Sequence, residues 1–273
     1  DVSETSLPIL ARTECALLAQ LPFSENFDGV QGSTTGSVNN LPDCWNHLSG
    51  TYASYAGYPI VYSTATYAQS TPNSLRFYTY TGTTDYGDQY AILPPIDPSV
   101  YPINTLRMRF AAREGSTTST YDFRLVIGVM TDPGNATTFV PVDTFDSHTT
   151  SYVNDTVYFA NYSGNGMYIA LKAPRNSGNN YNTGYVDNIV VEVAPVVCNT
   201  PTNVAVSGIT SSAATVTWTP GGSETYWNLQ YREASGNWSN NIAVANTPSY
   251  KLTGLTDSTT YVVRVQSACT AIA

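Results

Sequence analysis

Residues 106–110 read LRMRF, a strict alternation of apolar and charged side chains. A period of two places every second side chain on the same face of a β-strand, so this segment is predicted to be a strand with one buried face. The run FRLVIGVM at 123–130 is apolar almost throughout, which is typical of a central strand in a sandwich. Further strand-like runs occur at 156–159, 167–171 and 186–193, separated by turn-rich stretches. The sequence therefore predicts an all-β protein.

The composition argues against two classes of function. The chain has 273 residues and a net charge of −9, and its 11 lysines and arginines are not concentrated in any stretch. A phosphate backbone would find little positive charge, so nucleic-acid binding is not expected. No apolar run approaches the roughly 20 residues that a membrane-spanning helix needs, so membrane insertion is not expected either. The low share of charged residues, 11%, is typical of extracellular β-rich proteins.

A break divides the chain at residues 194–201, APVVCNTP. Two prolines within this short stretch, after a long apolar strand, indicate a short and stiff linker. We therefore predict an N-terminal lead segment at 1–20, a large β-sandwich at 21–196 and a smaller one at 197–273.

The smaller domain carries several features at a characteristic spacing: Pro201, Trp218, the alternation of Trp227, Leu229 and Tyr231, and the run LTDSTTY at 255–261. In these features, residues 199–273 resemble a fibronectin type III domain. The resemblance implies a small immunoglobulin-like sandwich with tryptophans in its core and a tyrosine hydroxyl that holds one corner. Only eight residues follow Val265, so we expect the last strand to be absent here or supplied by a partner.

The larger domain carries an ordered series of motifs: LPFSENFDG at 21–29, LPDCW at 41–45, AILPPI at 91–96, FVPVDT at 139–144, YIALK at 168–172 and YVDNI at 185–189. In their order and spacing, they resemble the cleaved-adhesin type of jelly-roll domain found in bacterial surface proteins, which is related in architecture to MAM domains. The resemblance implies a jelly-roll β-sandwich with an adhesin-like or carbohydrate-binding role.

The same resemblance implies a structural calcium ion at one edge of the sandwich. The matching positions here are Glu25, Asp28, Asp187 and Asn188, where Asn188 replaces an aspartate of the family. Calcium takes six to eight oxygen ligands, and an amide oxygen can serve, although one negative charge is lost. The alternative is local: Asp28 begins an Asx turn before Gly29, and Asp187 caps a strand.

Nine tyrosines fall within residues 52–90, an unusual density. A tyrosine offers a flat apolar ring and a hydroxyl at low entropic cost, which suits a recognition surface. Three of them, Tyr52, Tyr55 and Tyr58, lie among Gly, Ala and Ser with a spacing of three, so we expect an exposed loop that contacts a ligand. For others in the segment, such as Tyr78 and Tyr90, the alternative is that tyrosine simply suits a strand.

The four cysteines form two couples that are near neighbours in the sequence, Cys15 with Cys44 and Cys198 with Cys269. None occurs in a CxxC motif or near a histidine, so zinc is not expected. Of the three possible connectivities, we predict these two disulfides, formed in an oxidising compartment; buried free thiols are the alternative.

Catalytic motifs are missing from the sequence: it has no GxSxG, HExxH or glycine-rich phosphate loop, and only two histidines. A pair of catalytic carboxylates cannot be recognised from sequence alone. We therefore expect a monomeric, secreted or cell-surface adhesin-like protein that binds a glycan or a host protein and has no activity of its own. The alternatives are a carbohydrate-binding module of a larger enzyme and an architectural stalk.

Overall fold

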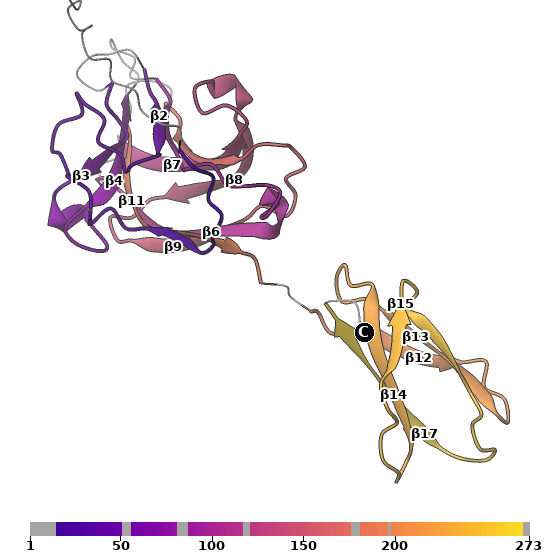
Figure 1. Cartoon of the computed structure of the whole chain (residues 1–273). Coiled ribbons are helices and arrows are strands. Elements are labelled where there is room, and N and C mark those ends of the chain that lie inside the picture. Colours follow the sequence, from indigo (N-terminus) through magenta and orange to yellow (C-terminus); the bar gives the residue numbers. More distant parts are fainter. Residues whose placement is uncertain are drawn as a thin grey trace, which may run out of the picture. The chain divides into compact units, whose positions relative to one another are not determined.

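The computed structural model describes residues 15–50, 56–80, 87–116, 121–175, 181–195 and 198–269. The chain divides into two compact units, residues 1–194 and 195–273 (Figure 1). This division lies close to the predicted boundary at 196/197. Both units are built from β-strands, and the only helical segments described are three 3-10 turns, η1 (Ala65–Tyr67), η2 (Ile103–Thr105) and η3 (Ala136–Thr138).

The first unit is a sandwich of two antiparallel leaves. One leaf has the order β2-β5-β10-β7-β8, and the other β9-β6-β11-β4-β3, with β1 also paired to β11. A short parallel pairing of β7 with β11 joins the two leaves. The strands are β1 (Phe23–Glu25), β2 (Asn46–Leu48), β3 (Ile60–Tyr62), β4 (Ser74–Tyr80), β5 (Gln89–Ile92), β6 (Leu106–Glu114), β7 (Tyr121–Met130), β8 (Val140–Ser147), β9 (Val153–Tyr158), β10 (Tyr168–Ala173) and β11 (Tyr181–Val193). This is the jelly-roll sandwich that the sequence predicts.

The core of the first unit follows from the alternation along its strands. In β6, Leu106, Met108 and Phe110 are buried in the core between the leaves. Because side chains alternate along a strand, the arginines at 107, 109 and 113 lie on the outer face of the same leaf. A run of buried aliphatic and aromatic side chains of this kind supplies most of the stability, at about 1.5–3 kcal/mol for each large side chain.

Strand β11 interrupts this alternation once. Val186 and Ile189 are both buried in the core although they are three residues apart. The register between β11 and β6 shifts between Asp187 and Val190, and Asn188 there has a φ of 51°. Asparagine tolerates this left-handed conformation, so a β-bulge resets the alternation and leaves Asp187 on the outer side of the leaf.

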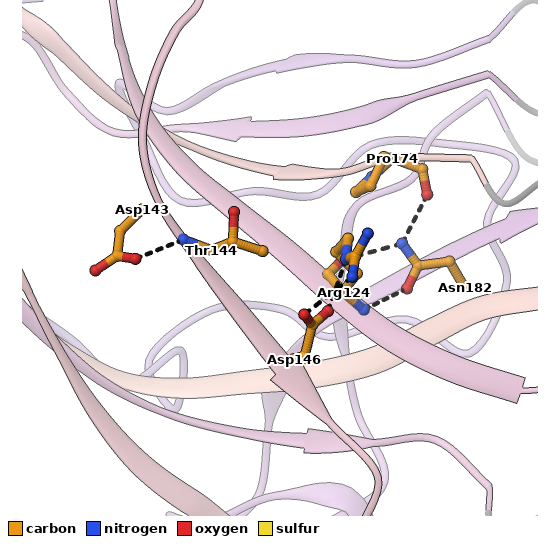
Figure 2. Close-up of polar contacts among 6 residues, drawn as sticks. All are labelled: Arg124, Asp143, Thr144, Asp146, Pro174 and Asn182. Carbon is orange, nitrogen blue, oxygen red and sulfur yellow. Dashed lines mark hydrogen bonds and ion pairs between the residues drawn. The ribbon is translucent and has the colours of Figure 1, made fainter.

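Two buried carboxamides tie the leaves together. Gln89 of β5 accepts a hydrogen bond from the backbone nitrogen of Tyr78 (2.8 Å) and donates to its carbonyl oxygen (2.6 Å). Asn182 of β11 accepts from the nitrogen of Arg124 (2.9 Å) and donates to the carbonyl oxygens of Arg124 (3.0 Å) and Pro174 (2.6 Å), as Figure 2 shows. Each side chain thus pairs backbone groups of a strand at a place that the neighbouring strand does not reach.

The second unit is a smaller sandwich of two three-stranded leaves, β12-β13-β16 and β15-β14-β17. Trp218 and Trp227 meet edge to face in its core, with ring centroids 5.6 Å apart. The hydroxyl of Tyr261 accepts a hydrogen bond from the nitrogen of Thr256 (3.0 Å), which is the predicted corner. Among the described residues, β17 pairs only with β14. The strands are β12 (Thr202–Ser207), β13 (Ala213–Thr219), β14 (Tyr226–Glu233), β15 (Ile242–Ala245), β16 (Ser249–Thr253) and β17 (Tyr261–Ala268).

Both predicted disulfides are confirmed. Cys15 is bonded to Cys44 near the start of the first unit, and Cys198 to Cys269 across the ends of the second. No cysteine is free.

Candidate functional site

Three strands of the first unit place a row of cationic and aromatic side chains on one outer face. Arg76 of β4 pairs in register with Tyr185 of β11, and Tyr185 pairs with Arg113 of β6. The neighbours Leu75 and Phe77 are buried in the core, so Arg76 between them lies on the opposite side of the leaf. The two arginines therefore flank one tyrosine on a single surface.

Further tyrosines from neighbouring strands and loops gather around this row. Tyr67 of η1 stacks on Tyr185, with ring centroids 4.6 Å apart and planes at 14°. Tyr62 lies 5.9 Å from both rings. Tyr78 lies 5.8 Å from Tyr58 and 5.4 Å from Tyr181. We call the set the tyrosine–arginine face: Tyr58, Tyr62, Tyr67, Tyr78, Tyr152, Tyr181, Tyr185, Arg76 and Arg113.

Arg76 lies at the centre of the aromatic rings. Its guanidinium carbon is 4.6 Å from the ring centroid of Tyr62 and 5.1 Å from that of Tyr78, with Tyr58 and Tyr185 each at 5.7 Å. These distances are within the range of cation–π attraction. The Nε atom is buried and has no hydrogen-bond partner. The rings therefore hold the cation in place without neutralising it.

Arg113 is held in a similar way. Its guanidinium carbon lies 5.5–5.9 Å from the rings of Tyr67, Tyr152 and Tyr185. It donates hydrogen bonds to the carbonyl oxygens of Thr66 (3.4 Å) and Glu114 (3.2 Å). Its partners among the described residues are thus aromatic rings and backbone carbonyls, and none is a carboxylate.

Two tyrosines of this face, Tyr152 and Tyr185, have a pKa above the ordinary value. Burial raises the pKa of Tyr185, against a smaller lowering by the charge of Arg76. Burial and the nearby charge of Asp187 raise the pKa of Tyr152, whose hydroxyl donates to the carbonyl oxygen of Tyr67 (2.6 Å). The face can offer flat rings, hydroxyls and positive charge to a ligand.

The fully buried carboxylate of Asp187 fixes the loop that carries Tyr67. Its Oδ2 accepts from the backbone nitrogens of Gln69 (2.7 Å) and Ser70 (2.9 Å). Its Oδ1 accepts from the hydroxyl of Ser70 (3.0 Å) and the nitrogen of Asn188 (2.7 Å). Burial nevertheless raises the pKa of Asp187, because these bonds offset only part of the cost of removing the charge from water.

The proposed calcium ligands come together only in part. Burial raises the pKa of Glu25, and the charges of Asp28 and Asp187 raise it further, so the three carboxylates are within electrostatic reach of one another. Glu25 accepts from the nitrogen of Phe27 (2.6 Å), and Asp28 from the nitrogen of Asn73 (3.3 Å) and the amide of Asn26 (2.9 Å). The described residues contain no group of three or more acidic, His or Cys side chains arranged to hold a metal ion.

These contacts decide how far the residues fit a calcium ion. Asp187 fits poorly, because four hydrogen bonds take up the lone pairs of its two oxygens. Glu25 and Asp28 fit in chemistry and retain acceptor capacity. Asn188 is exposed at the bulge and donates its backbone nitrogen to Asp187.

The expectation that Tyr58 is exposed on a loop is wrong. Its side chain is only 2% exposed and packs against Tyr78 and Arg76. Gly36 lies directly over the ring, where any side chain would overlap it. The spacing of three within a Gly/Ala/Ser setting does not mark exposure here, because other segments cover the ring. Tyr52 and Tyr55 lie outside the described residues.

Residues 199–272 match the family model of the fibronectin type III domain, so the predicted identity of the second unit is confirmed. No curated protein matches the sequence. The K1 cleaved adhesin domain of Lys-gingipain from Porphyromonas gingivalis W83 is 11% identical and has a TM-score of 0.44, with 64% of this chain and 100% of that domain covered. A fibronectin type III domain of human collagen XX is 24% identical, with a TM-score of 0.24, covering 28% of this chain and 91% of that one.

An enzyme structure is also similar in part. The glycoside hydrolase domain of Endo-D from Streptococcus pneumoniae R6 is 12% identical and has a TM-score of 0.39. The match covers 90% of this chain but only 43% of that structure, so the chain spans less than half of its length. Identities and TM-scores this low support no statement about ligand or activity.

Proposed function

We propose that the chain is a secreted or cell-surface, adhesin-like protein that binds a glycan or an extracellular protein through its tyrosine–arginine face and performs no catalysis. The observation that carries this proposal is the gathering of seven tyrosines and two arginines on the outer side of one leaf. Five of these tyrosines are half-buried and keep some surface for a ligand, while Tyr58 and Tyr185 are buried and support them. Tyrosine rings supply contact area at low entropic cost, and their hydroxyls bond to sugar or peptide groups.

Two observations support an extracellular location. All four cysteines are in disulfides, which persist in oxidising compartments. The second unit belongs to a type of module that often presents other domains. In addition, no helix among the described residues is long and apolar enough to cross a membrane.

Removing a ring from the face should weaken ligand binding. After a glycan and protein array has identified a ligand, Tyr62→Ala should lower its affinity by about 1 kcal/mol, or about fivefold, because one aromatic contact is lost. Tyr62→Phe keeps the ring and should lose less. Isothermal titration calorimetry on the whole chain measures both.

The matched control is Tyr158→Ala, since Tyr158 is an exposed tyrosine of β9 in the same leaf but outside the face. A chain that binds nothing on the array would favour the stalk alternative. Equal losses for Tyr62→Ala and Tyr158→Ala would place the binding site elsewhere. Binding restricted to polysaccharide would favour the carbohydrate-binding module.

We also propose that calcium binds beside Glu25 and Asp28, with Asp187 contributing negative charge from behind them. Calcium should raise the melting temperature of the first unit, and a chelator should lower it, because a ligand of the folded state stabilises it by mass action. Glu25→Gln should abolish this response. An identical melting curve of the parent chain with calcium and with chelator would contradict the proposal.

Without calcium, the raised pKa of Glu25 determines how the stability of the first unit changes with pH. Because the pKa of Glu25 is raised in the folded state, its contribution to stability is present below the ordinary value of 4.5 and is lost as the pH rises through the folded value. In chelator, Glu25→Gln should therefore flatten the fall in stability above pH 4.5 and be more stable than the parent at neutral pH.

A further inference from the structure

The two arginines of the face differ from other arginines of the same unit in having no anionic partner. Arg107 and Arg109 both pair with Glu192 at 2.7–2.8 Å. Arg124 pairs with Asp146 at 2.7 Å. No described carboxylate lies within ion-pair distance of Arg76 or Arg113, in a chain where acidic residues outnumber basic ones by 20 to 11. Unneutralised cations in such a chain call for an explanation.

Arg76 is also short of hydrogen-bond acceptors. Its Nε is buried without a partner, while its two terminal nitrogens are not among the buried unpaired atoms. No described residue accepts a hydrogen bond from them, so these nitrogens reach the solvent. The guanidinium carbon thus lies within 5.7 Å of four tyrosine rings, while the two terminal nitrogens have no acceptor among the described residues. The terminal nitrogens are therefore the donors that an acceptor from outside can reach, and a charge-assisted hydrogen bond to them would be stabilising.

We infer that the tyrosine–arginine face binds an acidic saccharide, with the sugar carboxylate on the guanidinium of Arg76, the sugar ring against the tyrosines, and Arg113 adding positive charge. The inference rests on the proposed function and names its ligand class. A planar guanidinium matches the two oxygens of a carboxylate, and tyrosine rings match the flat apolar side of a sugar. The buried anion on this side of the leaf, Asp187, is already satisfied by four donors and does not compete for Arg76.

Acidic sugars and their methyl esters test this inference directly, because the ester removes the charge and little else. Trigalacturonic acid and sialyllactose, each with its methyl ester, would be titrated into the whole chain. At least one acid should bind about tenfold or more tightly than its ester, the scale of a lost charge-assisted pair of hydrogen bonds. Its affinity should fall between about 0.05 M and about 0.5 M salt, while that of the ester should not.

Variants of single arginines show which residue causes the preference for the acid over its ester. Arg76→Met should remove the preference for the acid. Arg76→Lys should keep part of it, since lysine retains the charge but not the pair of parallel donors that a guanidinium offers to a carboxylate. Arg109→Met is the matched control, because it removes one positive charge from the same leaf and should leave the preference unchanged. Melting curves show whether each variant is folded; the comparison of acid and ester on the parent chain needs no variant.

Equal affinity for acid and ester, or no binding of either acid, overturns the inference. Preference for an aspartate-rich peptide over both acids also overturns it, in favour of a protein ligand. In each case the proposed function survives if Tyr62→Ala still weakens binding of a neutral glycan or a protein. The proposed function itself fails if no ligand found on the array loses affinity when a residue of the tyrosine–arginine face is changed.

Discussion

Asn182→Leu should lower the free energy of unfolding of the first unit by about 3 kcal/mol or more, because each buried polar group left without a partner costs about 1–3 kcal/mol. Asn182 has an exposed fraction of 0% and satisfies three backbone groups, two on Arg124 and one on Pro174. Leucine has a similar size but neither donates nor accepts. The loss should therefore come from the backbone groups that it leaves unpaired in the interior.

Chemical denaturation of the parent and the variant measures this difference. The matched control is Asp143→Ala, also drawn in Figure 2, which removes an exposed bond to the nitrogen of Thr144 (2.8 Å). A surface change of this kind should stay within about 0.5 kcal/mol. Asn182→Leu would contradict the expectation if its loss were as small as that of the control.

The sequence was sufficient to predict the architecture where a local pattern decides it. The alternation in LRMRF corresponds to buried Leu106, Met108 and Phe110, with the intervening arginines on the outer face. The corner formed by Tyr261 and Thr256 was predictable because the run LTDSTTY resembles the corner of fibronectin type III domains. Both disulfides followed from the proximity of the paired cysteines in the sequence.

The tyrosine–arginine face could not be predicted, because it depends on register between distant strands. Arg76, Tyr185 and Arg113 lie side by side only because β4, β11 and β6 pair at those residues. The one usable signal was the alternation in Leu75-Arg76-Phe77-Tyr78, which places Arg76 and Tyr78 away from the core. The sequence indicated a tyrosine-rich region correctly, but the grouping of Tyr52, Tyr55 and Tyr58 as one exposed loop failed at Tyr58.

The contacts of the carboxylates also depend on segments that are distant in the sequence. Their types and positions favoured a shared cation site, and electrostatic coupling between Glu25, Asp28 and Asp187 agrees with proximity. No local pattern indicated that the nitrogens of Gln69 and Ser70 would reach Asp187, because that contact joins a loop before β4 to a bulge in β11. The role of Asp187 therefore depends on a long-range contact, and it can be tested apart from calcium.

Asp187→Ala should destabilise the first unit by about 3 kcal/mol, because the part-buried nitrogens of Gln69, Ser70 and Asn188 lose a buried charged acceptor. A hydrogen bond to a charged group contributes about 1.5–3 kcal/mol, and water offsets part of the loss here. The loop that holds Tyr67 on Tyr185 should loosen as well. Amide hydrogen exchange at Gln69 and Ser70 should then become faster than in the parent, while exchange in β7 should change only with global stability.

A chelator separates this anchoring role from a role as metal ligand. If Asp187 acts through its hydrogen bonds, Asp187→Ala loses as much stability in chelator as in calcium, because the bonds do not involve the ion. If it acts mainly as a ligand, the parent in chelator falls to the level of the variant, and the two become equal. Glu25→Gln is the matched comparison: it removes one charge from the same cluster but leaves the donors on Asp187 paired. If amide exchange at Gln69 and Ser70 is slow in Glu25→Gln but fast in Asp187→Ala, the carboxylate of Asp187 itself holds the loop. If exchange is fast in both variants, the negative charge of the cluster as a whole holds it.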